Sequence, residues 1–519
     1  MIRIILNIVF LLFVYRASTQ QQWIEGKVFE DLNHNGVFDS NESGIKGVVV
    51  SNQHDVVLTD TDGNYKIEIN DPGMVFVVKP SGYRFQGGEN NFPQFYYNHN
   101  TAGAPEYLKY PGVQPTGALP KNVDFAMVKS DESKTYKALI IGDPQVADDE
   151  RLSNYRDGSI GDMLRHNADF YIVLGDIADD YLDIYPRENE IMGALNIPGY
   201  HVPGNHDVNY LSQGQEHQME TFKKYFGPEY YSFNYAKTHF VVLNNINYFG
   251  WNKEENKKGS YFGGLDEKQL TWLKNDLEQV PEDYLVVINS HIPFEEKYTD
   301  KEDIQKLFGL LNGRQKLLSL AGHLHAIKAQ WYNKDTYWES DAPFEELIAG
   351  AACGSWWTAP LDEEGVPLAT CMDGSPKGYF ILELTGNNYQ YKFIPANRPD
   401  DYQMRISFPM GDVTREDIDT NKLVVNWFTG KSSHEVEATI DGGKPIILEN
   451  VNATDPFIER TIDLRFNKDN WTPGIAKSNH IWEARLPIGL SPGIHRIDVK
   501  AYGDNSKVVK AYQVFEIVE

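Results

Sequence analysis

Positive charge is scarce in this chain. Over 519 residues, Lys and Arg number 48 and Asp and Glu number 74, which gives a formal net charge of −26 and a pI near 4.9. This balance argues against binding of DNA or RNA through a basic surface, because such binding places Lys and Arg against phosphates. It would also repel an anionic substrate at long range, so a phosphate site here needs local positive charge, which bound metal ions would supply.

Cysteine and long apolar runs are equally scarce. The only cysteines are Cys353 and Cys371, which we expect to form a disulfide if the chain is exported, the alternative being two buried thiols. One apolar stretch, from Ile4 to Tyr15, follows MIR and precedes RASTQQQ. It is shorter than the ~20 residues of a membrane-spanning helix. It predicts a signal peptide over residues 1–19 and a secreted or periplasmic location, with an uncleaved anchor or a buried strand as the alternatives. We expect no transmembrane anchor further on.

Three stretches of different pattern follow the leader. Residues 20–129 contain short β-rich runs between Gly, Asn and Asp turns, which predict a β-sandwich. Residues 130–395 alternate strand and helix patterns, which indicate an α/β domain. Residues 396–519 return to strand-like runs and predict a C-terminal β-rich domain.

Five apolar runs in the α/β stretch are each followed by residues of metal-ligand type. Each run is typical of a buried strand, and its polar residue stands at the carboxyl end, where open α/β sheets build their sites. The residues are Asp143, Asp176, Asn205-His206-Asp207, His291, and His323 with His325. Two divalent metals need oxygen and imidazole ligands of this kind, with one carboxylate able to bridge them. The ordered set therefore predicts a two-metal phosphoesterase.

The motifs that hold these residues point to a known family. GDPQ (142–145), GDIADD (175–180), GNHD (204–207), SH (290–291) and GHLH (322–325) resemble the calcineurin-like metallophosphoesterase superfamily. The resemblance implies an α/β two-sheet sandwich flanked by helices, here with all-β domains on both sides, as in exported bacterial three-domain members. Carried over by position, Asp176 would bridge the metals. Asp143 and His325 would complete the first site, and the second would take Asn205, His291 and His323. His206 would contact the substrate phosphate and protonate the leaving oxygen, with Asp207 orienting it.

One residue departs from the family's pattern. The first motif is usually Asp-x-His, and here it is Asp143-Pro144-Gln145. Gln145 offers a metal only a weak oxygen ligand, so the first site should bind its ion more loosely. The sequence leaves the metals open among Mn, Fe, Zn and Mg.

The resulting hypothesis is an exported enzyme that hydrolyses a phosphate monoester or diester. A metal-activated hydroxide would attack, and His206 would act as general acid. The substrate would be a phosphorylated small molecule, lipid or glycan. The alternative is a weak or inactive cell-surface protein that binds glycan or protein on the same scaffold. The oligomeric state is open.

Two further motifs lie outside this set. Trp356 and Trp357 are candidates for the wall of the substrate pocket, or for core packing. DLNHNGVFDSNE has the ligand spacing of an EF-hand loop around Gly36. Its predicted calcium ligands are Asp31, Asn33, Asn35, the backbone of Val37, Asp39 and Glu42. The segment resembles the immunoglobulin-like, calcium-binding B-type repeats of bacterial surface adhesins, which implies a structural ion.

Overall fold

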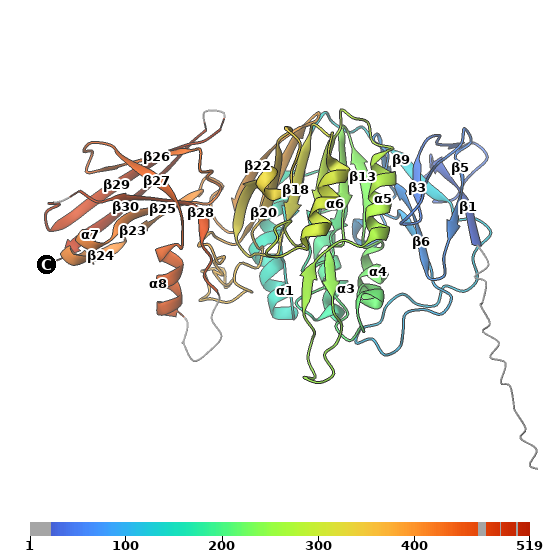
Figure 1. Ribbon diagram of the computed structural model, residues 1–519, viewed down its shortest axis with the longest axis horizontal. Coiled ribbons are helices and arrows are strands. Elements are labelled where there is room, and N and C mark those ends of the chain that lie inside the picture. Colours follow the sequence, from blue (N-terminus) through green and yellow to red (C-terminus); the bar gives the residue numbers. More distant parts are fainter. Residues whose placement is uncertain (1–21, 466–473, 488, 505–506, 519) are drawn as a thin grey trace, which may run out of the picture.

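The computed structural model describes residues 22–465, 474–487, 489–504 and 507–518. The predicted signal peptide, residues 1–19, lies outside this range. Three bodies follow one another along the longest axis of the molecule, with the N-terminal body at one end and the C-terminal body at the other (Figure 1). Within the described residues, no helix is both long and apolar enough to cross a membrane.

The N-terminal body consists of two β-sheets. One has the order β2-β1-β9-β7, with β5 also paired to β1, and the other has the order β4-β3-β6-β8. Their strands are β1 (Gln22–Glu30), β2 (Ser43–Gly44), β3 (Val49–Ser51), β4 (Val56–Leu58), β5 (Asn64–Ile69), β6 (Gly73–Val78), β7 (Tyr83–Phe85), β8 (Tyr96–His99) and β9 (Phe125–Lys129). The buried Lys79 joins this body to the central one, because its Nζ lies 2.5 Å from Glu132 and donates to the carbonyl of Asn234 at 2.8 Å.

The central body is a sandwich of two mixed sheets with helices outside them (Figure 1). The first sheet has the order β12-β11-β10-β21-β22. Its strands are β10 (Thr135–Ile141), β11 (Phe170–Val173), β12 (Gly199–His201), β21 (Gly378–Thr385) and β22 (Asn388–Pro395). The second has the order β13-β14-β17-β18-β20-β19. Its strands are β13 (Tyr231–Tyr235), β14 (Thr238–Val242), β17 (Leu285–Asn289), β18 (Leu317–Ala321), β19 (Ile327–Trp331) and β20 (Phe344–Ala349).

Each sheet contains a run of parallel strands that is largely buried. β10, β11 and β12 are parallel in one sheet, and β14, β17, β18 and β20 in the other. β11, β17 and β18 have no exposed residue. This burial matches their continuous apolar sequences, which are typical of strands covered on both faces. The helices are α1 (Asp149–Tyr155), α2 (Gly161–Met163), α3 (Tyr185–Gly193), α4 (Glu220–Phe226), α5 (Glu267–Leu277) and α6 (Lys301–Leu311), and a hairpin pairs β15 (Ile246–Tyr248) with β16 (Tyr261–Gly263). The predicted α/β fold flanked by β domains is confirmed.

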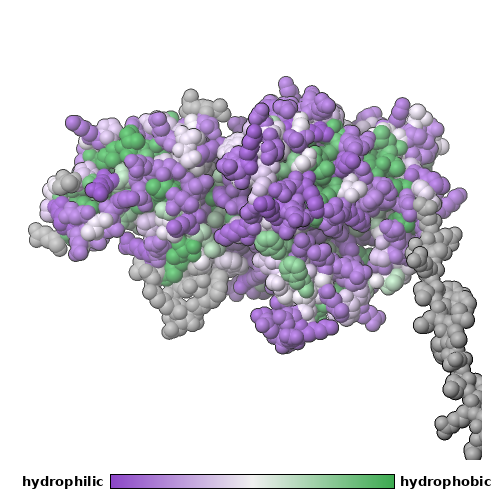
Figure 2. Space-filling model, viewed as in Figure 1, coloured by the Kyte–Doolittle hydropathy of each residue, from purple (hydrophilic) through white to green (hydrophobic). Residues whose placement is uncertain are grey.

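The C-terminal body is an eight-stranded sheet with the order β23-β25-β28-β27-β26-β29-β30-β24. Its elements are β23 (Met404–Phe408), β24 (Gly411–Thr414), α7 (Arg415–Thr420), β25 (Lys422–Trp427), β26 (Glu435–Ile440), β27 (Ile446–Ala453), α8 (Pro456–Arg465), β28 (Ser478–Arg485), β29 (Gly493–Tyr502) and β30 (Val508–Val518). Trp427 and Trp482 are buried in its core. The face shown in Figure 2 is largely hydrophilic, with separate apolar patches on each of the three bodies, in keeping with the acidic composition.

Candidate metal centre

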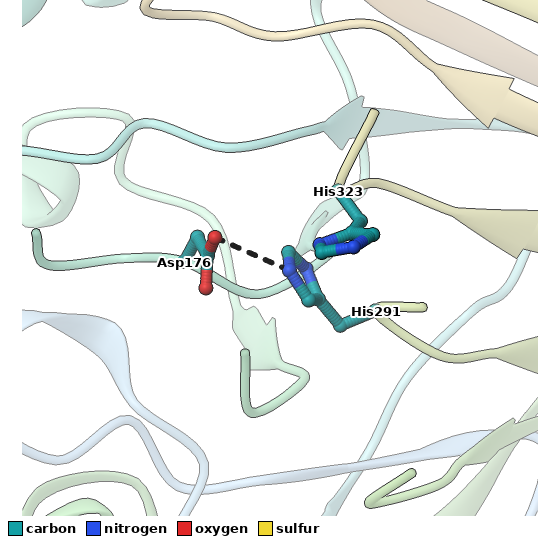
Figure 3. Close-up of side chains that lie close together, drawn as sticks. All are labelled: Asp176, His291 and His323. Atoms are coloured by element: carbon teal, nitrogen blue, oxygen red, sulfur yellow. Dashed lines mark ion pairs between the residues drawn. The ribbon is translucent and has the colours of Figure 1, made fainter. Parts of the chain in front are cut away.

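The centre is built around Asp176, which follows β11. Potential metal-ligand atoms of Asp176, His291 and His323 lie within 4.8 Å of one another (Figure 3). Among the described residues, no other three His, Cys, Asp or Glu side chains come together in this way. His291 follows β17 and His323 follows β18, so the two sheets meet at this point. Strand ends from both sheets thus deliver a carboxylate and two imidazoles to one place, as predicted from the apolar runs.

Hydrogen bonds fix the orientation of His291. Its Nδ1 donates to the carbonyl of Leu174 at 2.7 Å, which turns Nε2 toward Asn205 Oδ1 at 3.0 Å and Asp176 Oδ2 at 3.2 Å. A backbone carbonyl on the far ring nitrogen is the usual way in which proteins orient a metal-ligating histidine. Asn205 and His291, two of the three predicted ligands of the second metal, therefore lie together beside Asp176.

Asp143 and His325 form the other side of the centre. Asp143 follows β10, and both its carboxylate oxygens accept the backbone N–H of His323 at 3.0 Å. His325 Nδ1 donates to the carbonyl of Gly354 at 2.7 Å, and its Nε2 lies 3.7 Å from Asp143 Oδ1. The donor set of carboxylate, amide and imidazole groups fits two divalent ions.

The backbone of this centre is held in an unusual conformation. Asp143, Gln145, Asp176, His323 and His325 all have positive φ values, between 41° and 73°. Non-glycine residues seldom adopt this left-handed region, and such strain gathers at functional sites. The neighbouring Gly204 is required for a different reason: a Cβ there would lie 2.1 Å from the backbone nitrogen of Asp176.

The buried ionisable groups of the centre shift one another's pKa values. Burial alone would raise the pKa of Asp176, but the imidazoles of His291 and His206 lower it below its ordinary value. Burial would lower the pKa of His291, yet the Asp176 carboxylate raises it to about 9. Burial raises the pKa of Asp143 and lowers those of His323 and His325, to about 3 and about 4. Strongly perturbed groups of this kind mark functional sites.

Comparison with known proteins agrees with this geometry. Three family models match the chain: the N terminal of calcineurin-like phosphoesterase over residues 32–110, calcineurin-like phosphoesterase over 136–327, and the C terminal of calcineurin-like phosphoesterase over 346–508. The chain belongs to the calcineurin-like phosphoesterase superfamily. Members of this superfamily bind divalent metals in a dinuclear site, and the group around Asp176 is the candidate for it here.

Individual relatives of this chain are distant. A probable glycerophosphodiester phosphodiesterase from Arcobacter nitrofigilis is 28% identical over 180 residues, which is 33% of this chain and 62% of that protein. A dimetal phosphatase from Danio rerio is 16% identical over 51% of this chain and 98% of its own, with a TM-score of 0.34. A purple acid phosphatase from yellow lupin is 12% identical over 72% of this chain and 71% of its own, with a TM-score of 0.36.

His206 stands at the edge of the candidate metal centre, with 26% of its side chain exposed. Its backbone N–H donates to Asp176 Oδ1 at 2.8 Å, and its Nδ1 lies 3.1 Å from Asp180 and 3.4 Å from Asp179. Burial would lower the pKa of His206, but the carboxylates of Asp176 and Asp180 raise it above its ordinary value. The imidazole is thus flanked by two acids of the GDIADD motif, and no local pattern distinguishes them from other acidic residues.

The predicted role of Asp207 is wrong. Within the described residues, no hydrogen bond or ion pair joins its carboxylate to the imidazole of His206. It instead accepts the backbone N–H groups of Ile177, Ala178 and Gly204 and the hydroxyl of Tyr185, at 2.8–3.2 Å. Asp207 therefore ties the GDIADD loop to the GNHD loop, and Asp180 is the partner of His206.

Lys258 is a cation that sequence reasoning missed. It lies in the β15–β16 hairpin, where its Nζ contacts Asp180 and donates to the backbone carbonyl of Asn205 at 2.9 Å. No local motif marks it, because its role depends on how the hairpin folds back on the centre.

Gln145 lies in the centre, but other groups engage its side chain. Its Nε2 donates to Asp179 at 3.3 Å, and its Oε1 faces the thiol of Cys353 at 3.8 Å. Gln145 therefore links the first motif to the acid pair beside His206.

The structure contradicts the predicted disulfide. Cys353 and Cys371 are both buried free thiols, and each has its own surroundings. The Sγ of Cys353 faces Gln145 and Gly354, whereas that of Cys371 faces the carbonyls of Ala351 and Pro376, all at 3.7–3.8 Å. Both thiols belong to the hydrophobic core cluster that also holds Ala351, Ala352 and Trp357.

The two tryptophans have different places. Trp356 is half-buried and stacks on the imidazole of His325, with ring centroids 4.1 Å apart, so it borders the centre as predicted. Trp357 is 5% exposed and donates from Nε1 to the carbonyl of Pro144 at 2.9 Å. Of the two alternatives, Trp357 therefore takes core packing, and it braces the first motif from the core.

The predicted calcium loop lies between β1 and β2, without flanking helices. Asp31 accepts backbone N–H groups from His34, Asn35 and Gly36, and Glu42 accepts those of Leu32 and Asp39. The side-chain amides of Asn33 and Asn35 donate to Asp39. The carboxylates of Asp31, Asp39 and Glu42 thus accept hydrogen bonds from other residues of the same loop. Calcium binding by this loop stays a prediction.

Proposed function

We propose that this chain is an exported phosphoesterase that uses two divalent metals to hydrolyse a phosphate monoester or diester. The observation that carries the proposal is the convergence of Asp176, His291 and His323, with the other predicted ligands beside them, where strand ends of both sheets meet. Asp143, Asp176 and His325 would hold one ion, and Asn205, His291 and His323 the other. Ions so held supply Lewis acidity and lower the pKa of water toward 7.

His206 is proposed as the general acid. Its Nδ1 faces the carboxylates of Asp179 and Asp180, which leaves Nε2 to face a substrate. The bond from phosphorus to the leaving oxygen breaks as that oxygen takes the proton from Nε2. Five of the six proposed ligands are buried, whereas the side chain of His206 is partly exposed. His206 is therefore placed where a substrate can reach it.

A substrate panel tests the function. The chelated full-length chain, reloaded with Mn, Zn, Fe, Mg or Ca, would be assayed on phosphomonoesters and on diesters. Glycerophosphodiesters belong in the panel because a relative is named for them. We expect hydrolysis that Asp176→Asn removes and that His239→Ala, a change in a buried pair elsewhere in the central body, leaves in place. No hydrolysis above the Asp176→Asn background with any metal would favour the inactive binding protein instead.

A further inference from the structure

The loop of residues 350–377, between β20 and β21, holds His325 at three points. The carbonyl of Gly354 accepts from its imidazole at 2.7 Å, and the indole of Trp356 stacks on that ring. The backbone N–H of Met372 donates to the carbonyl of His325 at 2.9 Å. Both the ring and the backbone of His325 therefore depend on where this loop lies.

The C-terminal body holds the end of the same loop. Asp373 is fully buried, and its Oδ2 accepts the backbone N–H of Ile327 at 2.6 Å and lies 3.0 Å from Nε2 of His480 on β28. The Nδ1 of His480 lies 2.8 Å from Oδ1 of Asn426 on β25. β28 is on the side of the C-terminal body that faces the central one (Figure 1).

The directions of these hydrogen bonds follow from their partners. Nδ2 of Asn426 faces two acceptors, the carbonyl of Asp373 at 2.9 Å and the carboxylate of Asp455 at 2.7 Å. Its Oδ1 is therefore the atom that faces His480, so Nδ1 of His480 donates. Nε2 faces a carboxylate and donates as well. Both ring nitrogens of His480 are thus used as donors, and an apolar side chain would leave Oδ1 of Asn426 without this donor and Oδ2 of Asp373 with only the backbone N–H of Ile327.

We infer that the C-terminal domain completes the metal centre, because His480, through Asp373, holds the 350–377 loop where it fixes His325. His480 is a positioning residue and touches neither metal nor substrate. The metal part of this inference rests on the proposed function. In support, one family model runs over residues 346–508, so it treats the loop and the C-terminal body as one unit.

Thiol labelling tests, independently of activity, whether His480 holds the 350–377 loop in place. The chain's two cysteines, Cys353 and Cys371, both lie buried in this loop, so an aromatic disulfide reagent applied to the native chain reports loop opening. In His480→Ala, we expect the labelling rate to rise by about 10- to 100-fold, because the buried carboxylate of Asp373 loses its donor from the C-terminal body.

A matched control exists within the chain. His239 makes the same pair of contacts, to Asp276 at 2.8 Å and to Asn234 at 2.8 Å, equally buried but in β14 of the central body. His239→Ala should leave the labelling rate unchanged. An equal acceleration in His239→Ala, or unchanged labelling in His480→Ala, would overturn the inference.

Metal content gives the second readout. After Mn loading, His480→Ala should lose about tenfold or more in affinity at one site and keep the other, whereas His239→Ala keeps both. His480→Gln retains one donor, so it should give intermediate labelling, and it serves as the test variant if His480→Ala does not fold. Faster labelling with both Mn affinities unchanged would overturn the link to the metal centre. A native chain that binds no Mn would contradict the proposed function. The labelling rates would still show whether His480 holds the 350–377 loop.

Discussion

His206 is the one residue of the proposed chemistry that combines partial exposure with two carboxylate partners. In His206→Ala we expect turnover on an alkyl phosphate to fall by about 10²–10⁴, because the leaving oxygen loses its proton donor. Metal content should stay nearly intact. The loss should shrink for nitrophenyl esters, whose leaving group needs no proton. Unchanged turnover on the alkyl ester would remove His206 from the mechanism.

Gln145 should set the strength of the first metal site. Its amide donates to Asp179 at 3.3 Å, and an amide oxygen is at best a weak metal ligand. We expect one ion to be held tightly and the other loosely, and Gln145→His to tighten the looser site and shift its preference toward Zn or Fe. Mn and Zn titrations of the chelated chain, before and after the substitution, would measure this. Two equal affinities in the native chain would contradict it.

Glu188 predicts a pH dependence of stability. It lies buried on α3, and neither carboxylate oxygen has a hydrogen-bond partner among the described residues. Burial, with the nearby Asp207 carboxylate, raises the pKa of Glu188 from 4.5 to about 8. Between these values the folded state keeps a proton that the unfolded state has lost. The free energy of unfolding should therefore fall as pH rises through this window, by up to about 1.4 kcal/mol per pH unit.

Urea unfolding of Glu188→Gln measures this contribution. The variant should match the native chain near pH 4.5 and exceed it increasingly up to pH 8. Glu190→Gln, at an exposed position of the same helix, should show no such trend. A stability difference between Glu188→Gln and the native chain that is constant from pH 5 to pH 9 would show that Glu188 is not the titrating group.

Sequence reasoning reached the ligand residues but not their supports. Asp143, Asp176 and His291 could be predicted because each follows an apolar run, and a strand end fixes where the next side chain lies. The supports come from loops that fold back over long sequence distances. Lys258 reaches Asn205, and Gly354 reaches His325, and neither residue has a local pattern that shows this.

The helical patterns of residues 130–395 form regular helices to different extents, for local reasons. α5 begins after Asp266, whose carboxylate accepts the N–H of Gln269 at 2.7 Å, as its N-cap position predicts. The segment RLSNYRDGSIGDMLRHN also has a helical pattern, but the structure breaks it into α1, a π-turn at Arg156–Ile160, and short turns beyond. Gly158 and Gly161 lie at this break, and glycine disfavours a regular helix.

The loop from Asp31 to Glu42 is predicted to bind calcium as an element of the N-terminal body. Calorimetry on the full chain should show Ca²⁺ binding that Asp31→Ala abolishes, because ligand position 1 is lost. Asp60→Ala is the control: Asp60 also accepts backbone N–H groups in a tight turn, from Asp62 and Asn64, but lacks the twelve-residue ligand spacing. Binding insensitive to Asp31→Ala would place the ion elsewhere.

At the scale of the whole molecule, the acidic net charge makes the proposed metal ions necessary for binding an anionic substrate. A chain of net charge −26 would need local positive charge to bind a phosphate ester. Lys258 cannot supply it by itself, because its charge is already paired with Asp180. The sequence predicted three bodies by their patterns. It could not predict that His480 of the C-terminal sheet reaches the loop beside His325, because strand alternation shows which residues are buried but not against which partner.

The central claim is that two metal ions bind at the junction of the two sheets. Anomalous scattering from crystals of the chain loaded with Mn tests it most directly. We predict two peaks beside Asp176, one also near Asp143 and His325 and one also near Asn205, His291 and His323, both lost in Asp176→Ala. Peaks only at other places, or none at any Mn concentration, would contradict the account.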